Sequence, residues 1–149
     1  MKILMVFLGN ICRSPLAEGI LRNKIPNMKV TVDSAGTAGY HIGRKPDPRA
    51  IDIAKKNNID ISSLRARKFE RSDFINFDKI YVMDKNNYYD IIDLAENKDQ
   101  TSKVILITDV IDSDSFVPDP YYGDLADFEK VFNLLEKICQ KIANQIESR

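Results

Sequence analysis

The sequence predicts an α/β fold in which a mostly parallel sheet carries helices on both faces. Three observations support this class. Short apolar runs that resemble strands alternate along the chain with longer segments of helical periodicity, as in successive βαβ units. The first and last of these runs are almost continuously apolar, which is typical of strands covered on both faces. The 149 residues contain no internal repeat and no linker-like segment, so residues 1–149 are expected to form a single domain.

Each expected element follows from its local pattern. Four short runs rich in Ile, Val, Leu or Tyr predict strands at residues 2–7, 29–34, 79–84 and 103–108. Periodic segments between them predict helices at residues 14–25, 47–58, 84–96 and 124–148. Ser14 and Pro15 suit the N-cap and first position of the first helix, an Asp-Pro pair opens the second, and one apolar stripe follows the last. Ligands of such folds bind where strands end, and the first strand ends at Phe7.

Composition and charge exclude several classes of function. The 22 basic and 22 acidic residues balance, which argues against nucleic acid or an anionic membrane as the partner. No apolar run approaches the ~20 residues that span a bilayer, and the N-terminal run is interpreted as a strand and not as a signal peptide. Two distant cysteines, Cys12 and Cys139, make neither a disulfide framework nor a zinc site, so a cytoplasmic location is expected.

The segment "VFLGNICRSP" predicts an anion cradle between the first strand and the first helix. A glycine-containing loop at this point can turn several backbone N–H groups towards a ligand, and the helix N-terminus adds its positive dipole. The planar guanidinium of Arg13 can clamp two phosphate oxygens. The alternative is an ordinary strand-to-helix turn with an exposed arginine. The expected phosphate-binding residues are Leu8, Gly9, Asn10, Ile11, Cys12, Arg13 and Ser14.

A second segment, "VPDPYYGD" at residues 117–124, complements this loop. A phosphoryl-transfer site needs an acid to protonate the leaving oxygen, and Asp119 supplies a carboxyl group. An aromatic ester also needs a flat wall, which Tyr121 and Tyr122 can provide. Taken alone, the same residues are compatible with a turn followed by a helix cap.

Four stretches together resemble the low-molecular-weight protein tyrosine phosphatases over the whole chain: "VFLGNICRSPLAEG", "DSAGTAGYHIGRKPDPRA", "FDKIYVMDKNN" and "VPDPYYGDLADFEKVF". The resemblance implies a three-layer, flavodoxin-like (phosphotyrosine phosphatase I-like) fold with a four-stranded parallel sheet. It also implies hydrolysis of phosphotyrosine through a cysteinyl-phosphate, with no metal or other cofactor. The expected partner is a phosphotyrosine protein or an aryl phosphate, and the expected state is a monomer or weak dimer.

The resemblance also implies roles for individual residues. Arg13 matches the arginine that binds phosphate, and Asp119 matches the general acid. Asn10, Ser14 and Ser34 match polar residues that hold the loop in shape.

Further residues match the supports and walls of the site. Asp84 and Arg67 match an ion pair behind the loop. The walls that grip an aromatic ring are implied to be Leu8, Tyr40, Tyr121 and Tyr122.

Position 7 departs from the family pattern. The family signature is Cys, five residues, Arg and Ser, and counting back from Arg13 over residues 8–12 reaches Phe7. A benzyl group has no lone pair to attack phosphorus, so the covalent intermediate cannot form there. Cys12 matches a second loop cysteine that acts as a redox partner in the family, and it is not expected to replace the nucleophile. Cys139 lies on an apolar stripe and is expected to be core.

Several interpretations of Phe7 stay open at this point. The chain is a natural pseudophosphatase, or it carries an inactivating substitution in an otherwise ordinary enzyme, or it retains weak activity through another nucleophile such as water. Competing functions are a non-catalytic phosphotyrosine- or anion-binding module and, remotely, an arsenate reductase. The last is disfavoured because the loop cysteine is missing and only Cys139 lies late in the chain. The ring of Phe7 is expected over or in the loop mouth, where it would weaken oxyanion binding.

Other polar residues near the expected site are interpreted as surface groups. His41 is the only histidine and lies in a loop beside Tyr40. Arg44, Lys45 and Arg49 either add positive potential at the mouth of the pocket or form a solvated basic face, which is the more common role of such a run.

Overall fold

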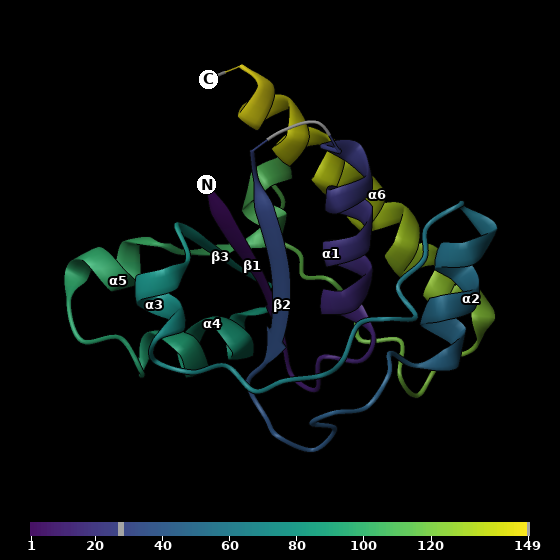
Figure 1. The fold of residues 1–149 in the computed structure, drawn as a ribbon, viewed down its shortest axis with the longest axis horizontal. Coiled ribbons are helices and arrows are strands. Elements are labelled where there is room, and N and C mark those ends of the chain that lie inside the picture. Colours follow the sequence, from purple (N-terminus) through teal and green to yellow (C-terminus); the bar gives the residue numbers. More distant parts are fainter. Residues whose placement is uncertain (27–28, 149) are drawn as a thin grey trace.

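The computed structural model describes residues 1–26 and 29–148, which form a parallel sheet between two layers of helices (Figure 1). The strand order of its four-stranded sheet is β2-β1-β3-β4. The strands are β1 Lys2–Phe7, β2 Thr31–Gly36, β3 Lys79–Val82 and β4 Val104–Leu106. Since β2 and β3 flank β1 on opposite sides, the chain changes direction at β1, and the carboxyl end of β1 opens at the switch point. The predicted fold class is confirmed.

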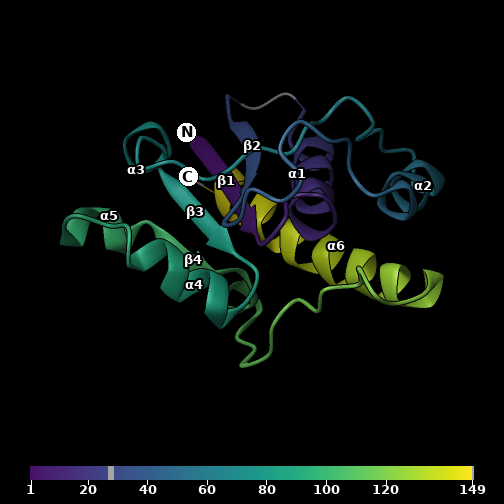
Figure 2. The same ribbon diagram turned by 90° about the horizontal axis from the view of Figure 1, so that it is seen from below.

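Helices cover both faces of this sheet. The helices are α1 Arg13–Lys24, α2 Pro48–Lys56, α3 Asp73–Asn76, α4 Lys85–Ile92, α5 Lys98–Ser102 and α6 Leu125–Glu147, with a 3₁₀ turn η1 Ile107–Ile111. Figure 2 shows α1 and α6 on one side of the sheet and α3, α4 and α5 on the other. In the described part of the chain, no helix combines the length and apolarity needed to cross a bilayer.

Alternation along β1 explains its continuously apolar sequence. Ile3, Met5 and Phe7 belong to the core under α1 and α6, whereas Leu4 and Val6 belong to the core on the opposite face. All five side chains are at most 2 % exposed. Phe7 therefore has the burial of a core residue, although it stands at the strand end that borders the candidate site.

Most element boundaries agree with the sequence patterns, and the exceptions have local causes. The expected strand 29–34 runs instead over Thr31–Gly36, and the expected strand 103–108 stops at Leu106 because η1 follows directly. The expected helix 84–96 ends at Ile92, and the short helices α3 and α5 were not predicted. The side-chain Oδ1 of Asn97 accepts a 2.9 Å hydrogen bond from the N–H of Gln100. The start of α5 is therefore set by an N-cap and not by an apolar periodicity.

Candidate active site

Residues 8–12 form a loop that joins the carboxyl end of β1 to the N-terminus of α1. Asn10 adopts a left-handed conformation with φ of 58°, and its side-chain oxygen accepts a 2.7 Å hydrogen bond from the hydroxyl of Ser14. Within the described residues, the backbone N–H groups of Gly9 to Arg13 find no protein acceptor. A series of unpaired N–H groups at a helix N-terminus is the ordinary construction of an anion site.

Two glycines allow this loop to approach its neighbours closely. A Cβ atom on Gly9 would lie 2.9 Å from Cδ2 of His41. A Cβ atom on Gly36, which pairs with Phe7 across the sheet, would lie 2.7 Å from the carbonyl oxygen of Leu8. The loop therefore sits against β2 and the His41 segment with no room for a larger residue at either position.

The side chain of Phe7 is stacked against the guanidinium of Arg13. The Cζ atom of Arg13 lies 3.8 Å from the centroid of the Phe7 ring, a cation–π contact at van der Waals distance. Phe7 is 2 % exposed and lines the same cavity as Leu8, Tyr40 and Tyr121. The ring thus lies between the core and this cavity and faces the group that was expected to clamp phosphate.

Arg13 is buried and already bonded to protein acceptors. Its Nη1 donates to the carboxylate of Asp84 at 3.0 Å and to the carbonyl oxygen of Val117 at 2.6 Å. Burial lowers the pKa of Arg13, and the nearby carboxylates of Asp119 and Asp84 oppose that effect. The Nε atom is buried without a protein partner among the described residues, so this side chain keeps unused donor capacity.

Asp119 lies at the mouth of the cradle. Its Oδ1 accepts the N–H of Tyr121 at 3.0 Å, and its Oδ2 lies 4.0 Å from Nη2 of Arg13. Its side chain is 35 % exposed. The carboxyl group is therefore oriented by its own turn and remains accessible to a ligand in the cleft.

Arg49 anchors the segment that carries Asp119. Its guanidinium donates to the carbonyl oxygens of Gly123 at 2.9 Å and Tyr121 at 2.7 Å, and it forms a bidentate pair with Asp47. It also lies 4.6 Å from the ring centroid of Phe128. The interpretation of Arg49 as part of a solvated face is wrong. Spacing gave no signal for this role, since the Arg-to-carbonyl bonds span more than 70 residues.

Aromatic side chains wall the cavity above Phe7. Its lining residues are Phe7, Leu8, Gly9, Ile11, Tyr40, His41, Asp119, Tyr121 and Tyr122, and its volume is about 130 Å³. The His41 ring lies 6.4 Å from that of Tyr40 and 6.1 Å from that of Tyr121, so the histidine stands between two predicted wall residues. Its Nδ1 is buried and, among the described residues, unpaired. His41 thus lines the cleft beside which it was expected to lie, and it is not a plain surface group.

The predicted support behind the loop is arranged differently. Asp84 does not pair with Arg67: Oδ1 of Asp84 caps α4 through the N–H of Asn87, and its Oδ2 accepts from Arg13. Arg67 instead pairs with Asp33 and Asp73 on the other side of β2. The expectation of an Asp84–Arg67 pair is therefore wrong, because Asp84 is bonded to Arg13 and Asn87, and Arg67 is bonded to Asp33 and Asp73.

Ser34 also has another partner than expected. Its hydroxyl donates to Oε1 of Glu18 at 2.6 Å, within the core under α1, and makes no hydrogen bond to the loop in the described structure. Glu18 also pairs with Arg22 at 2.6 Å. Ser34 therefore ties β2 to α1, and any effect on the loop passes through that helix.

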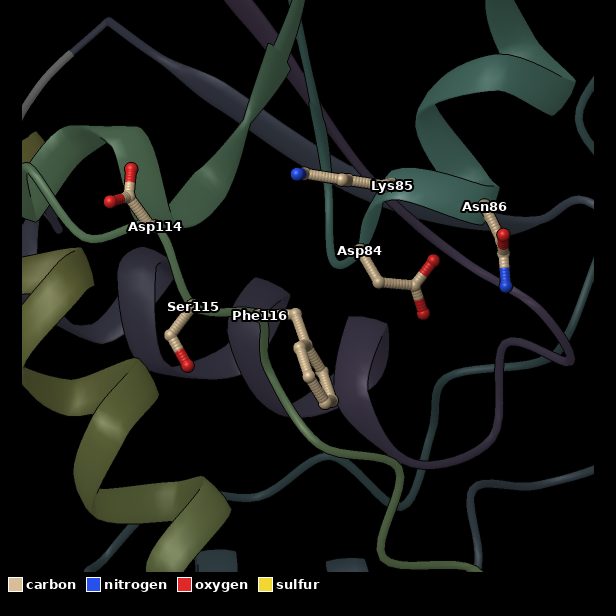
Figure 3. Close-up of a pocket in the computed structure, with 6 residues that line it drawn as sticks. All are labelled: Asp84, Lys85, Asn86, Asp114, Ser115 and Phe116. Carbon is tan, nitrogen blue, oxygen red and sulfur yellow. The ribbon is translucent and has the colours of Figure 1, made fainter.

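A separate cavity of about 300 Å³ lies on the far side of Asp84 (Figure 3). It is lined by Asp84, Lys85, Asn86, Asp114, Ser115 and Phe116. Figure 3 shows the Asp84 carboxylate pointing away from the ammonium group of Lys85. Solvent reaches Asp84 from this side, which agrees with the 23 % exposure of its side chain.

The loop cysteine is not poised for chemistry. Cys12 is completely buried, and burial, followed by the nearby carboxylates of Asp47 and Asp119, raises the pKa of its thiol far above the usual range. Reactive thiols have the opposite shift. Within the described residues, no group of three or more His, Cys, Asp or Glu side chains is placed to hold a metal ion.

Comparison with known proteins gives a consistent picture. Residues 2–149 match the family model described as low molecular weight phosphotyrosine protein phosphatase. A low molecular weight phosphotyrosine protein phosphatase of Schizosaccharomyces pombe is 38% identical, over 97% of this chain and 96% of the relative. A protein tyrosine phosphatase of Entamoeba histolytica, crystallised with Hepes in its active site, superposes with a TM-score of 0.92 at 38% identity, covering 99% of this chain and 97% of that one. A Vibrio vulnificus structure in complex with benzylphosphonate has a TM-score of 0.88 at 32% identity, covering 97% of both chains.

Proposed function

The chain belongs to the low molecular weight phosphotyrosine protein phosphatase family, and we propose that it is a non-hydrolysing member that keeps the aromatic cleft but admits no phosphate group. One observation carries this proposal: the Phe7 ring lies 3.8 Å from the guanidinium of Arg13, the side chain that was expected to bind phosphate. Phe7 occupies the position of the nucleophile without supplying one, and its ring also excludes a phosphate group.

No other group of the site supplies the missing nucleophile. Cys12 is buried, and its thiol is protonated at neutral pH because its pKa is strongly raised. The general acid Asp119 protonates a leaving oxygen only after attack at phosphorus has begun, so it does not replace the first step. Loss of a nucleophile that works as part of a unit costs several orders of magnitude in rate.

Steric exclusion of phosphate follows from the same geometry. The family relative from Vibrio vulnificus binds benzylphosphonate, a ligand with one aryl group and one phosphonate group. If the site of the present chain takes ligands in the same way, the benzyl group of Phe7 occupies the phosphonate end from within. Close-packed interiors do not give way to a second group of this size, so a phosphate would have to displace the ring.

A second candidate function is a non-catalytic phosphate-binding module. The unpaired N–H groups of Gly9 to Arg13 favour it, since they form an anion site once the ring moves away. Phosphate or vanadate that raised the melting temperature of the unaltered chain, without hydrolysis, would support this function over the first.

The experiment is p-nitrophenyl phosphate hydrolysis by the chain beside its Phe7→Cys variant. We expect negligible turnover by the unaltered chain and a gain of at least about a thousandfold in the variant, whose new thiolate would lie beside Arg13 and the loop N–H groups. Phe116→Cys is the matched control, because Phe116 is 55% exposed and lies outside the cradle.

Two results would contradict the proposal. Turnover by the unaltered chain within about tenfold of the ~10 s⁻¹ enzyme median would show that it hydrolyses aryl phosphates without the thiolate. A folded Phe7→Cys variant that stayed inert would show that position 7 alone does not account for the inactivity.

A further inference from the structure

The cleft above Phe7 has the size of one aromatic ring. Its volume is about 130 Å³, and an apolar cavity of about 150 Å³ holds one benzene molecule. The Phe7 ring closes the floor, while Tyr40, His41 and Tyr121 form the sides. A ring that enters this cleft can make offset or edge-on contacts with three aromatic walls and an aromatic floor.

At the mouth of the cradle, the carboxylate of Asp119 provides a hydrogen-bond acceptor with negative charge. Oδ1 of Asp119 accepts the N–H of Tyr121, but Oδ2 is 4.0 Å from the nearest guanidinium nitrogen of Arg13, beyond hydrogen-bond distance. That oxygen can accept a proton donor such as a phenolic hydroxyl. A phosphate carries a charge of about −2 at neutral pH, so the same oxygen repels it.

The rim of the cleft is also apolar. Among the lining residues, Leu8 is 41% exposed, Tyr40 74% and Tyr122 96%. A free phenol would fill the cleft and leave these side chains in water. A tyrosine within a polypeptide would bring neighbouring residues onto them and bury more apolar surface.

We propose that this cleft binds the unphosphorylated side chain of a tyrosine in a partner polypeptide, in place of the phosphotyrosine that the family hydrolyses. The inference rests on the proposed function, because it requires that Phe7 exclude phosphate from the cradle. The tyrosine ring packs on Phe7 between the aromatic walls, and its hydroxyl donates to Oδ2 of Asp119. Phosphorylation of the ligand then releases it, through both the lost donor and the added charge.

The test is a ¹H–¹⁵N NMR titration of the unaltered chain with three seven-residue peptides that differ only at the centre: tyrosine, phosphotyrosine or phenylalanine. We expect the tyrosine peptide to shift the amide signals of Gly9, Tyr40, His41 and Asp119. The phosphotyrosine peptide should bind at least about tenfold more weakly than the tyrosine peptide, because its negative charge faces Asp119 and its phosphate group clashes with the Phe7 ring. Phenylalanine should bind about three- to tenfold more weakly, since it lacks the hydroxyl donor. N-acetyltyrosinamide should bind at least about tenfold more weakly than the tyrosine peptide, because it does not cover the rim.

Three variants separate the contributions. Phe7→Ser, which opens the cradle without adding a catalytic thiol, should reverse the preference towards phosphotyrosine. Asp119→Asn keeps an acceptor but removes the charge, so it should narrow the gap between the tyrosine and phosphotyrosine peptides. Tyr121→Ala should weaken binding of the tyrosine peptide several-fold. The matched control is Tyr89→Ala, which should leave this binding unchanged, because Tyr89 is 61% exposed on α4 and lies outside the cleft.

Each result that differs from these expectations contradicts a specific part of the proposal. The proposal is wrong if the tyrosine peptide does not bind, if phosphotyrosine binds as well or better, or if phenylalanine binds as well as tyrosine. Equal affinity for the peptide and for N-acetyltyrosinamide would refute a polypeptide partner and favour a small phenol. Because p-nitrophenyl phosphate hydrolysis is measured separately, a tyrosine peptide that fails to bind, with no hydrolysis, contradicts this inference alone and leaves the proposed function standing. Phosphotyrosine that binds as well as or better than tyrosine contradicts the exclusion of phosphate as well. Hydrolysis by the unaltered chain contradicts the proposed function itself.

Discussion

Replacing Arg49 by methionine should destabilise the protein by about 2–3 kcal/mol. The substitution keeps the apolar stem but removes two charge-assisted hydrogen bonds, to Tyr121 and Gly123, together with the pair to Asp47. Hydrogen bonds to charged groups contribute about 1.5–3 kcal/mol each. The lower end of this range applies to Arg49, because its side chain is 32% exposed and water can replace part of each hydrogen bond. With a urea m-value of about 2 kcal/mol/M, the unfolding midpoint should fall by about 1–1.5 M without a change in m.

The pH dependence of this loss gives a sharper check. Burial tends to raise the pKa of Asp47, but the hydrogen bonds and charge of Arg49 outweigh it, so the pKa is lower than usual. A depressed pKa contributes stability above the unfolded value of about 3.9, and this contribution is lost as the pH falls through the folded value. The difference in the free energy of unfolding between the unaltered chain and Arg49→Met should therefore be largest at neutral pH and should decrease below about pH 4.

The measurement is urea unfolding at pH 7 and pH 3, with Arg44→Met as the matched control. Arg44 is an exposed arginine nearby, so its loss should change the free energy of unfolding by at most ~0.5 kcal/mol. A loss below about 0.5 kcal/mol for Arg49→Met, or a loss of the same size at both pH values, would refute the reasoning.

Three further predictions concern the loop and the cysteines. Gly36→Ala should cost about 2 kcal/mol or more by urea unfolding, because its Cβ would meet backbone, the Leu8 carbonyl oxygen at 2.7 Å. Asn10→Ala should cost about 1–2 kcal/mol, since alanine loses the bond to Ser14 and tolerates φ of 58° poorly; Asn10→Gly, which accepts that φ, should cost less. Cys12 and Cys139 are buried and have raised thiol pKa values, so neither should react with a disulfide reagent at pH 8 in native protein, while both should react in denaturant.

The sequence predicted the fold well because periodicity and burial are closely linked in this architecture. The alternation of apolar runs and amphipathic segments required a parallel sheet between helices, and the structure has one. Boundaries were less accurate where a single hydrogen-bonded cap decides them, as Asn97 does for α5. Hydrophobic periodicity does not reveal such a cap, because the cap acts on a single turn of the chain.

The details of the candidate site were harder to predict, for a physical reason. Ion-pair partners depend on the three-dimensional positions of residues far apart in the sequence. Arg67 pairs with Asp33 and Asp73, and Asp84 pairs with Arg13, 71 residues away. The role of Arg49 depends on carbonyl oxygens, which every residue carries and no sequence pattern marks. Position 7 could be identified as unusual only through the family resemblance, because a buried phenylalanine at the end of a strand is ordinary.

The side chain at position 7 is separable from the framework of the cradle. The loop is held by the Asn10–Ser14 hydrogen bond, by the close contact of Gly36 with the Leu8 carbonyl, and by the bonds of Arg13 to Asp84 and Val117. None of these uses the side chain of residue 7. Phe7 therefore extends the core under α1 and α6, while the loop, Asp119 and the aromatic walls keep their places. On the function proposed above, a phenylalanine at this position removes phosphoryl transfer and leaves a cleft that accommodates an aromatic ring.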